Sequence, residues 1–308
     1  MKKNLFIALL CCSFFPVFGQ INMSDSTAQV VGYWNKNEKQ SYIITEEKLK
    51  IKDADTTERA VLKYVVDVTV KDSTANSYTI DWHYRDFDFK SDTYNQIMVD
   101  LMSVTQNMTI TIKTDEFGAF QEVVNWKDVR GYIYKATDKM KKTYREIAHM
   151  DKVIAQVEDM FKTKEAIEAS SIEDIQQFYS FHGGKYKLKE ENTGTIQLHN
   201  IYDSKEPFDA KVTVWLDEIN PDDDNYIIRY NQVVDEKQLN DAVFAYLNKI
   251  AKTMKTAVPK KEDMPLFQNE VNLASRIHNT GWIIYSVQTK TVVAEDFTNI
   301  TETIIEIQ

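Results

Sequence analysis

Apolar and polar residues alternate along several stretches of the chain, with the period of two that is typical of half-buried β-strands. The clearest apolar sets are Val66, Val68 and Val70, followed by Tyr78, Ile80, Trp82 and Tyr84. The polar segment between these sets is typical of a turn, so residues 60–85 are predicted to form a hairpin. A second hairpin, over residues 40–72, is expected to share a strand with it.

The same alternation predicts further strands downstream. It marks residues 108–112, a hairpin over 212–230 with its turn at 220–225, and two closing strands over 282–294 and 297–308. Antiparallel pairing suits these runs, because short polar segments are enough to join antiparallel neighbours.

The middle of the chain changes to the three- and four-residue spacing of a helix. Apolar residues recur at this spacing from Val129 to Phe161, which predicts either one long helix or two helices with a break near His149. Asn125 is the predicted N-cap of this segment, because Asp128 follows it at the third helical position.

Two further helices are predicted from capping residues and apolar spacing. Ser171 is expected to begin a short helix with Asp174 at its third position, and the glycine pair 183–184 is expected to end it. Asp235 is expected to cap a C-terminal amphipathic helix over 236–254.

Together these elements predict an α+β fold in which large, curved antiparallel sheets dominate. We expect a leader over residues 1–19, an N-terminal β-rich half over 20–125, a helical segment over 126–184 and a C-terminal β-rich half over 185–308. Similar strand openings in the two halves favour a duplication, although hairpin periodicity alone explains the similarity equally well.

The N-terminal residues have the layout of a secretory signal peptide. Lys2 and Lys3 precede an apolar run over residues 5–15, which is too short to span a membrane. The residues at the −3 and −1 positions of the predicted cleavage site, Val17 and Gly19 before Gln20, are small to medium in size. The mature chain is therefore expected in the periplasm or outside the cell, with no transmembrane segment.

Both cysteines, Cys11 and Cys12, lie inside this leader. The mature chain has no thiol, which excludes a disulfide framework, a cysteine zinc site and a cysteine nucleophile. Lipid anchoring at Cys11 or Cys12 is not expected, because the small residue that should precede a lipidated cysteine is missing at both.

The mature chain is strongly acidic. The formal net charge is −10, and loss of two lysines with the leader, without loss of any acidic residue, makes it −12. A nucleic-acid partner is not expected, because phosphate groups would repel this surface.

No motif for catalysis, metal binding or a cofactor is found. The five histidines lack the spacing of a metal pair, and His182 is expected to be a cation at a helix end. The acidic run 222–224 has no neighbouring glycine and is predicted to be a hairpin turn, not a calcium loop. Neither a Gly-x-Ser-x-Gly elbow nor a glycine-rich phosphate loop occurs.

Three short sequences share the order aspartate, hydroxyl residue, threonine. They are Asp25-Ser26-Thr27, Asp55-Thr56-Thr57 and Asp72-Ser73-Thr74. This order resembles the O-glycosylation motif of exported proteins in some Gram-negative bacteria, which makes Ser26, Thr56 and Ser73 candidate acceptors. The same residues also make good turns without any modification.

The signal, the thiol-free chain and the strands interrupted by helices resemble uncharacterised exported proteins of Gram-negative bacteria. More loosely, they are similar to envelope lipid and lipoprotein carriers, in which a curved sheet encloses helices. This resemblance, together with an aromatic content of 12%, favours a non-catalytic binding protein that holds an apolar ligand or a protein partner. The alternatives are an assembly component that acts through sheet edges and a hydrolase with an unrecognised carboxylate pair.

Overall fold

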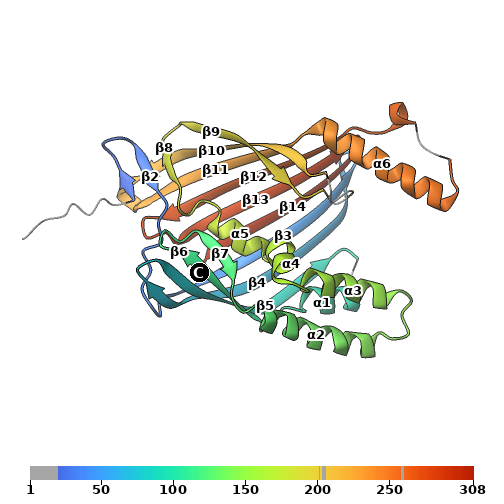
Figure 1. Ribbon diagram of the computed structural model, residues 1–308, viewed down its shortest axis with the longest axis horizontal. Helices are drawn as coiled ribbons and strands as arrows, with labels where there is room; N and C mark the ends of the chain where they lie inside the picture. The colour runs from blue at the N-terminus through green and yellow to red at the C-terminus, as the bar shows by residue number, and fades with distance from the viewer. Residues whose placement is uncertain (1–19, 94, 201, 203–205, 258–259) are drawn as a thin grey trace, which may run out of the picture.

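The computed structural model describes residues 20–93, 95–200, 202, 206–257 and 260–308, so the predicted leader with Cys11 and Cys12 lies outside the described residues. The described chain is built around an antiparallel sheet of eleven strands in the order β7-β6-β5-β4-β3-β14-β13-β12-β11-β10-β9 (Figure 1). The predicted α+β class with a dominant antiparallel sheet is confirmed.

The strands of the large sheet are β3 (Lys39–Lys52), β4 (Asp55–Thr74), β5 (Ser77–Ser91), β6 (Thr109–Asp115), β7 (Phe120–Val123), β9 (Glu191–Leu198), β10 (Phe208–Asn220), β11 (Asn225–Val234), β12 (Phe267–His278), β13 (Ile283–Ala294) and β14 (Phe297–Ile307). A small second sheet contains β1 (Ile21–Asn22), β2 (Thr27–Gln29) and β8 (Lys185–Lys187). The helices are α1 (Gln96–Met102), α2 (Trp126–Thr143), α3 (Met150–Met160), α4 (Lys164–Ser170), α5 (Glu173–Tyr179) and α6 (Glu236–Met254).

The predicted hairpins are present as β3–β4–β5, β10–β11 and β13–β14. Pairing of β14 with β3 joins strands from before and after the helical segment into one sheet, and β12 lies between β11 and β13. Neither this long-range pairing nor the strands β9 and β12 was predicted. The division into two related halves stays a prediction.

The helical segment breaks where the sequence indicates. The helix α2 ends at Thr143, and His149 precedes α3 in the left-handed conformation, with φ of 65°. In α6, the predicted cap is confirmed, because Oδ1 of Asp235 accepts from the backbone N–H of Gln238 at 2.8 Å. None of the helices in the described part combines the length and hydrophobicity needed to cross a membrane.

The predicted start of α2 is confirmed in position, because the helix begins at Trp126 directly after Asn125. Only the predicted side-chain cap is wrong: the Asn125 side chain accepts from the Thr111 N–H at 2.8 Å and donates to the Thr109 carbonyl at 2.9 Å, so it connects the helix start to β6. The predicted start at Ser171 is wrong as well. Ser171 follows the last residue of α4, and α5 begins at Glu173. In both places a tertiary contact or a neighbouring helix overrides the local capping rule.

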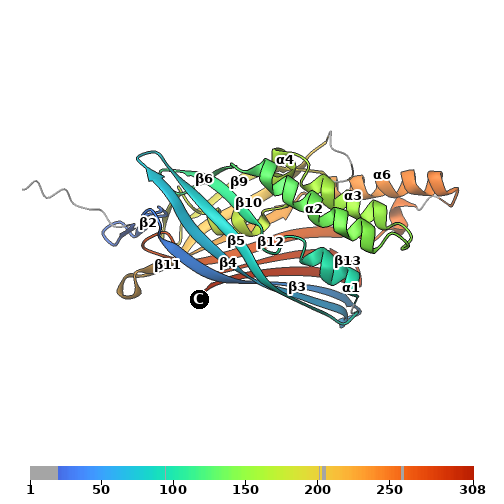
Figure 2. The same cartoon turned by 90° about the horizontal axis from the view of Figure 1, so that it is seen from below.

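The core lies between the concave face of the sheet and α5. The helices α2, α3, α4 and α6 all lie on one side of the strands β3 and β4 (Figure 2). The Phe178 ring meets the Trp82 and Tyr42 rings edge-on, each at 5.2 Å between centroids, and all three side chains are fully buried. Nε2 of Gln177 donates to the Ser286 hydroxyl at 3.0 Å and to the Thr303 carbonyl at 3.1 Å, which ties α5 to β13 and β14.

A bulge in β5 decides which residues of that strand face the helices. Asp86 has a φ of 58°, and the pairing with β4 shifts register at this point. Before the bulge, even-numbered residues such as Tyr84 face the core, whereas after it Phe87 packs against the core and Asp88 is exposed. One extra residue therefore keeps an apolar wall on the concave face along the whole strand.

A matched pair of glycine substitutions tests the packing at the β12–β13 turn. Gly281 has a φ of 85°, and a Cβ there would lie 2.4 Å from the Val31 carbonyl oxygen, whereas a Cβ on the exposed Gly131 of α2 would meet nothing within 4 Å. We expect Gly281→Ala to lower the free energy of unfolding by about 1–3 kcal/mol. Gly131→Ala should raise it by about 0.5–1 kcal/mol, because alanine favours the helix. Urea unfolding measures both, and a Gly281→Ala variant as stable as the wild type would contradict the described turn.

Candidate functional site

An apolar groove opens where the concave face continues beyond α5. It consists of two adjoining pockets of about 170 and 340 Å³, which share Glu46, Lys48, Leu62 and Met102. The walls come from β4 and β5 on one side and from α1, α3 and α4 on the other, and these helices gather beside that end of the sheet (Figure 1). Its apolar lining includes Leu62, Phe87, Phe89, Met98, Met102 and Met160.

The charges at the mouth of the apolar groove are paired with one another. Nζ of Lys48 lies 2.8 Å from Oε1 of Glu46, and Nζ of Lys50 lies 2.5 Å from Oε2 of Glu58. Because each lysine has its own glutamate, the mouth contributes no net charge. These exposed pairs add little to stability.

Asp174 lines the inner end of the apolar groove and is 8% exposed. Its Oδ2 accepts from the Tyr64 hydroxyl at 3.0 Å, and its Oδ1 accepts from the Tyr84 hydroxyl at 3.3 Å and from the Ile175 N–H at 2.9 Å. Burial raises the pKa of Asp174 from 3.8 to about 6, and these hydrogen bonds only partly offset that effect. Burial also raises the pKa values of Tyr64 and Tyr84, which keeps both hydroxyls protonated as donors.

No lysine or arginine of the described residues lies within ion-pair distance of Asp174. The neighbouring Lys290 is bound to Glu173, with 2.6 Å between Nζ and Oε2. Asp174 is also the one buried carboxylate among the residues that the structure describes. Asp174 lies in the first turn of α5, near the helix start that the capping pattern predicted, but its side chain is directed to β4 and β5. The sequence did contain an indication that Asp174 is buried, because it is four residues before Phe178 and so shares the core-facing side of the helix.

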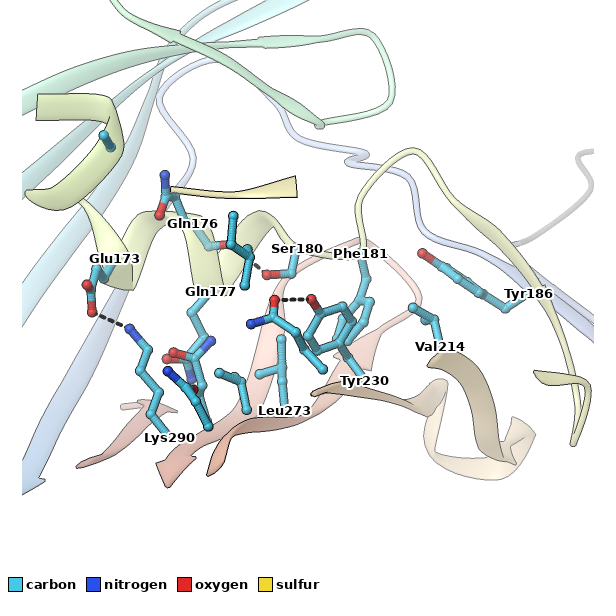
Figure 3. Close-up of a pocket in the computed structure, with 16 residues that line it drawn as sticks. Glu173, Gln176, Gln177, Ser180, Phe181, Tyr186, Val214, Tyr230, Leu273 and Lys290 are labelled. Atoms are coloured by element: carbon cyan, nitrogen blue, oxygen red, sulfur yellow. Dashed lines mark hydrogen bonds and ion pairs between the residues drawn. The ribbon is translucent and has the colours of Figure 1, made fainter. Parts of the chain in front are cut away.

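A second pocket, of about 570 Å³, lies on the other side of α5 (Figure 3). Its lining mixes amide and hydroxyl groups, such as Gln176 and Ser180, with apolar groups such as Phe181 and Leu273. The Glu173–Lys290 ion pair lies between this pocket and the apolar groove, because Glu173 lines both of them. This pocket offers hydrogen-bonding groups from α5 and from the sheet.

The residues of the predicted cleavage and modification sites are not brought together. Gly19 lies outside the described residues, whereas Gln20 is 3% exposed; its side chain donates to the Val31 carbonyl and accepts from the Tyr226 hydroxyl at 2.6 Å. The candidate acceptors Thr56 and Ser73 are exposed near strand ends, and Ser26 lies half-buried in the turn between β1 and β2. Cleavage and glycosylation stay predictions.

The histidines form no site in the described part of the chain. His182 is buried, and its Nε2–H donates to the Gly281 carbonyl at 2.9 Å. Burial lowers the pKa of His182 to about 4, so the expected cation at the helix end is wrong: the ring is neutral at neutral pH. Within the described ranges, no group of three or more His, Cys, Asp or Glu side chains is arranged to hold a metal ion.

The comparisons with known proteins are sparse. No protein-family model matches the chain, and no curated protein matches it significantly. Among solved structures it is similar to lipovitellin, in a structure that describes lipid–protein interactions, with 9% identity and a TM-score of 0.38. The match covers 89% of this chain and 25% of the lipovitellin chain. This score is too low to assign a common fold, so nothing known of lipovitellin is transferred.

Asp174→Asn tests whether burial raises the pKa of the Asp174 carboxyl group. Because the folded-state pKa of Asp174 is raised, its ionisation destabilises the folded state as the pH rises from 3.8 through about 6, and the penalty is complete above that range. We expect Asp174→Asn to gain about 1–3 kcal/mol of stability relative to the wild type between about pH 4 and pH 8.

Urea unfolding across this pH range measures the difference. A matched change at an exposed carboxylate, Asp222→Asn, controls for the loss of one negative charge. A stability difference between Asp174→Asn and the wild type that does not change with pH would contradict the raised pKa.

Proposed function

We propose that the chain is an exported, non-catalytic binding protein that holds an apolar ligand in the apolar groove. The observation that carries this proposal is the continuous apolar wall formed by β4, β5 and α1, which is open to solvent and lined by leucine, phenylalanine and methionine. Methionine side chains adapt to irregular apolar ligands, and aromatic rings supply large contact areas. Concave, mostly apolar pockets with a few polar groups are the usual form of small-molecule sites.

The energetics suit a ligand with a hydrocarbon chain. Each buried methylene contributes about 0.8 kcal/mol, so a few of them suffice for binding once the cost of ordering the ligand is included. The neutral mouth of the groove neither attracts nor repels a ligand by net charge. Specificity then depends on the polar groups at the inner end.

Two observations support a binding role over catalysis. Asp174 faces two tyrosine hydroxyls and not a second carboxylate, and the adjacent Glu173 is neutralised by Lys290. A carboxylate pair for hydrolysis requires two acids that converge on one bond with separated protonation states.

A second candidate function is assembly through a sheet edge. The edge strand β9 pairs with β10, and most of its residues are exposed, including Ile196 at 37%. An exposed edge offers a row of backbone groups to a strand of another protein.

Export is supported by the leader, in which two lysines precede a short apolar run. Processing after Gly19 would leave Gln20 as the first residue, and the Gln20 side chain is held by Tyr226 and Val31. An exported protein encounters the molecules of the cell envelope, so the ligand of the groove is expected among them.

Charged substitutions in the groove test ligand binding directly. Met98 is 43% exposed in the first turn of α1, where an aspartate is compatible with the helix dipole. We expect Met98→Asp to weaken the binding of N-phenyl-1-naphthylamine, a fluorescent apolar probe, by about tenfold. Met23→Asp is the matched control, because Met23 is 56% exposed in a turn away from the groove. Equal probe affinity in the two variants would rule out the groove as the binding site.

Native mass spectrometry of the protein from its own cells tests processing and cargo together. We expect the mature chain to begin at Gln20 and to carry a co-purifying lipid-sized mass; hexose-sized increments would identify modification of Ser26, Thr56 or Ser73. A chain that still begins at Met1 in the cytosolic fraction would refute export. A co-purifying protein without a lipid would favour the assembly function.

A further inference from the structure

Asp174 is a buried carboxylate without a positively charged partner in the described part of the chain. Buried charges in proteins are normally paired with an opposite charge, because removal from water is costly. Tyr64 and Tyr84 donate hydrogen bonds to the carboxylate, but neither carries a charge to neutralise it. Asp174 lines a solvent-open groove, so a ligand bound in the groove can supply this positive charge.

We propose that the apolar groove takes a cationic amphipath, a long-chain compound whose protonated amine pairs with the Asp174 carboxylate while its chain lies against Leu62, Phe87 and Met102. This inference rests on the proposed function and names the chemical class of its ligand. The geometry provides a continuous path, because the Tyr64 ring stacks on Phe87 at 4.9 Å between centroids with 7° between planes. The same Tyr64 side chain thus joins the apolar wall to the carboxylate.

The charged groups around Asp174 leave its negative charge uncompensated. From β3, Glu46 lies close enough to raise the pKa of Tyr64 further, and its lysine partner, Lys48, is at the exposed mouth. On α5 itself, Glu173 takes up Lys290 from β13. The remaining neighbours are the Tyr64 and Tyr84 hydroxyls and the Ile175 N–H, which are all neutral donors, so no formal positive charge in the described part of the chain offsets the carboxylate.

This charge pattern discriminates between head groups on chains of equal length. An alkyl ammonium group donates hydrogen bonds to a carboxylate and also neutralises it, and such charge-assisted bonds are about twice as strong as neutral ones. An alcohol supplies the hydrogen bond without the charge. A fatty acid would place a second negative charge beside Asp174, which disfavours binding.

Displacement of N-phenyl-1-naphthylamine by three ligands with the same chain tests the inference. Dodecylamine, dodecanol and dodecanoate are compared below their micelle-forming concentrations, at about pH 8, where Asp174 is ionised. We expect dodecylamine to displace the probe from the wild type at a concentration about tenfold lower than dodecanol requires, with dodecanoate the weakest.

Three variants locate the effect. Asp174→Asn should bring dodecylamine and dodecanol to equal potency, whereas Asp222→Asn removes the same charge from an exposed turn and should leave the preference unchanged. Tyr64→Phe removes one donor but keeps the carboxylate, so it should lower the affinity for dodecylamine less than Asp174→Asn does. Attraction of the amine to the acidic surface in general would be weakened equally in both asparagine variants.

The outcomes separate the inference from the function on which it rests. Equal displacement by amine and alcohol in the wild type would overturn the cationic ligand and leave an apolar binding site in place. An amine preference that survives in Asp174→Asn would also overturn it. Failure of all three ligands and of the probe to bind would overturn the proposed function itself. Equal displacement in the wild type overturns the inference by itself, so the test does not depend on the folding of Asp174→Asn.

Discussion

The contact of α5 with the concave face of the sheet fills the centre of the core. A helix of seven residues is not stable in water by itself, so α5 exists because the sheet holds it. Phe178 supplies the apolar contact with Trp82 and Tyr42, and Gln177 supplies hydrogen bonds to β13 and β14. Because α5 lies on the concave face with a pocket on each side, it also sets where the apolar groove begins.

The position of α5 has a favourable and an unfavourable effect on stability. The same helix that brings Phe178 to the core also brings Asp174, whose charge is buried without a cationic partner among the residues that the structure describes. Functional sites commonly contain groups that reduce the stability of the free protein. A ligand that neutralises such a group recovers part of that stability on binding, so occupancy and stability are linked.

Much of the fold could be predicted from local pattern, because β3, β4, β5, β10, β11, β13 and β14 alternate with the period of a half-buried strand. The strand β9 lacks an apolar face, since it is an exposed edge, and no local rule indicates it. Pairing of β14 with β3 joins residues more than 200 positions apart, which periodicity does not address. The groove could not be predicted for the same reason, because its lining residues, such as Glu46 and Asp174, are far apart in the sequence. Asp174 itself was assigned by a capping rule, although its burial is a tertiary effect.

The bulge at Asp86 links the chemistry of the groove to the length of a strand. Side chains alternate between the two faces of a sheet, so every residue beyond Asp86 owes its orientation to that one additional position. One residue inserted directly after the bulge would turn Phe87 and Phe89 outward and direct Asp88 and Lys90 inward, whereas loss of Asp86 itself would remove the bulge and keep both phenylalanines on the concave face. A single insertion in β5 would thus replace the apolar wall with a charged one without any substitution, so the length of this strand sets which groups the groove presents.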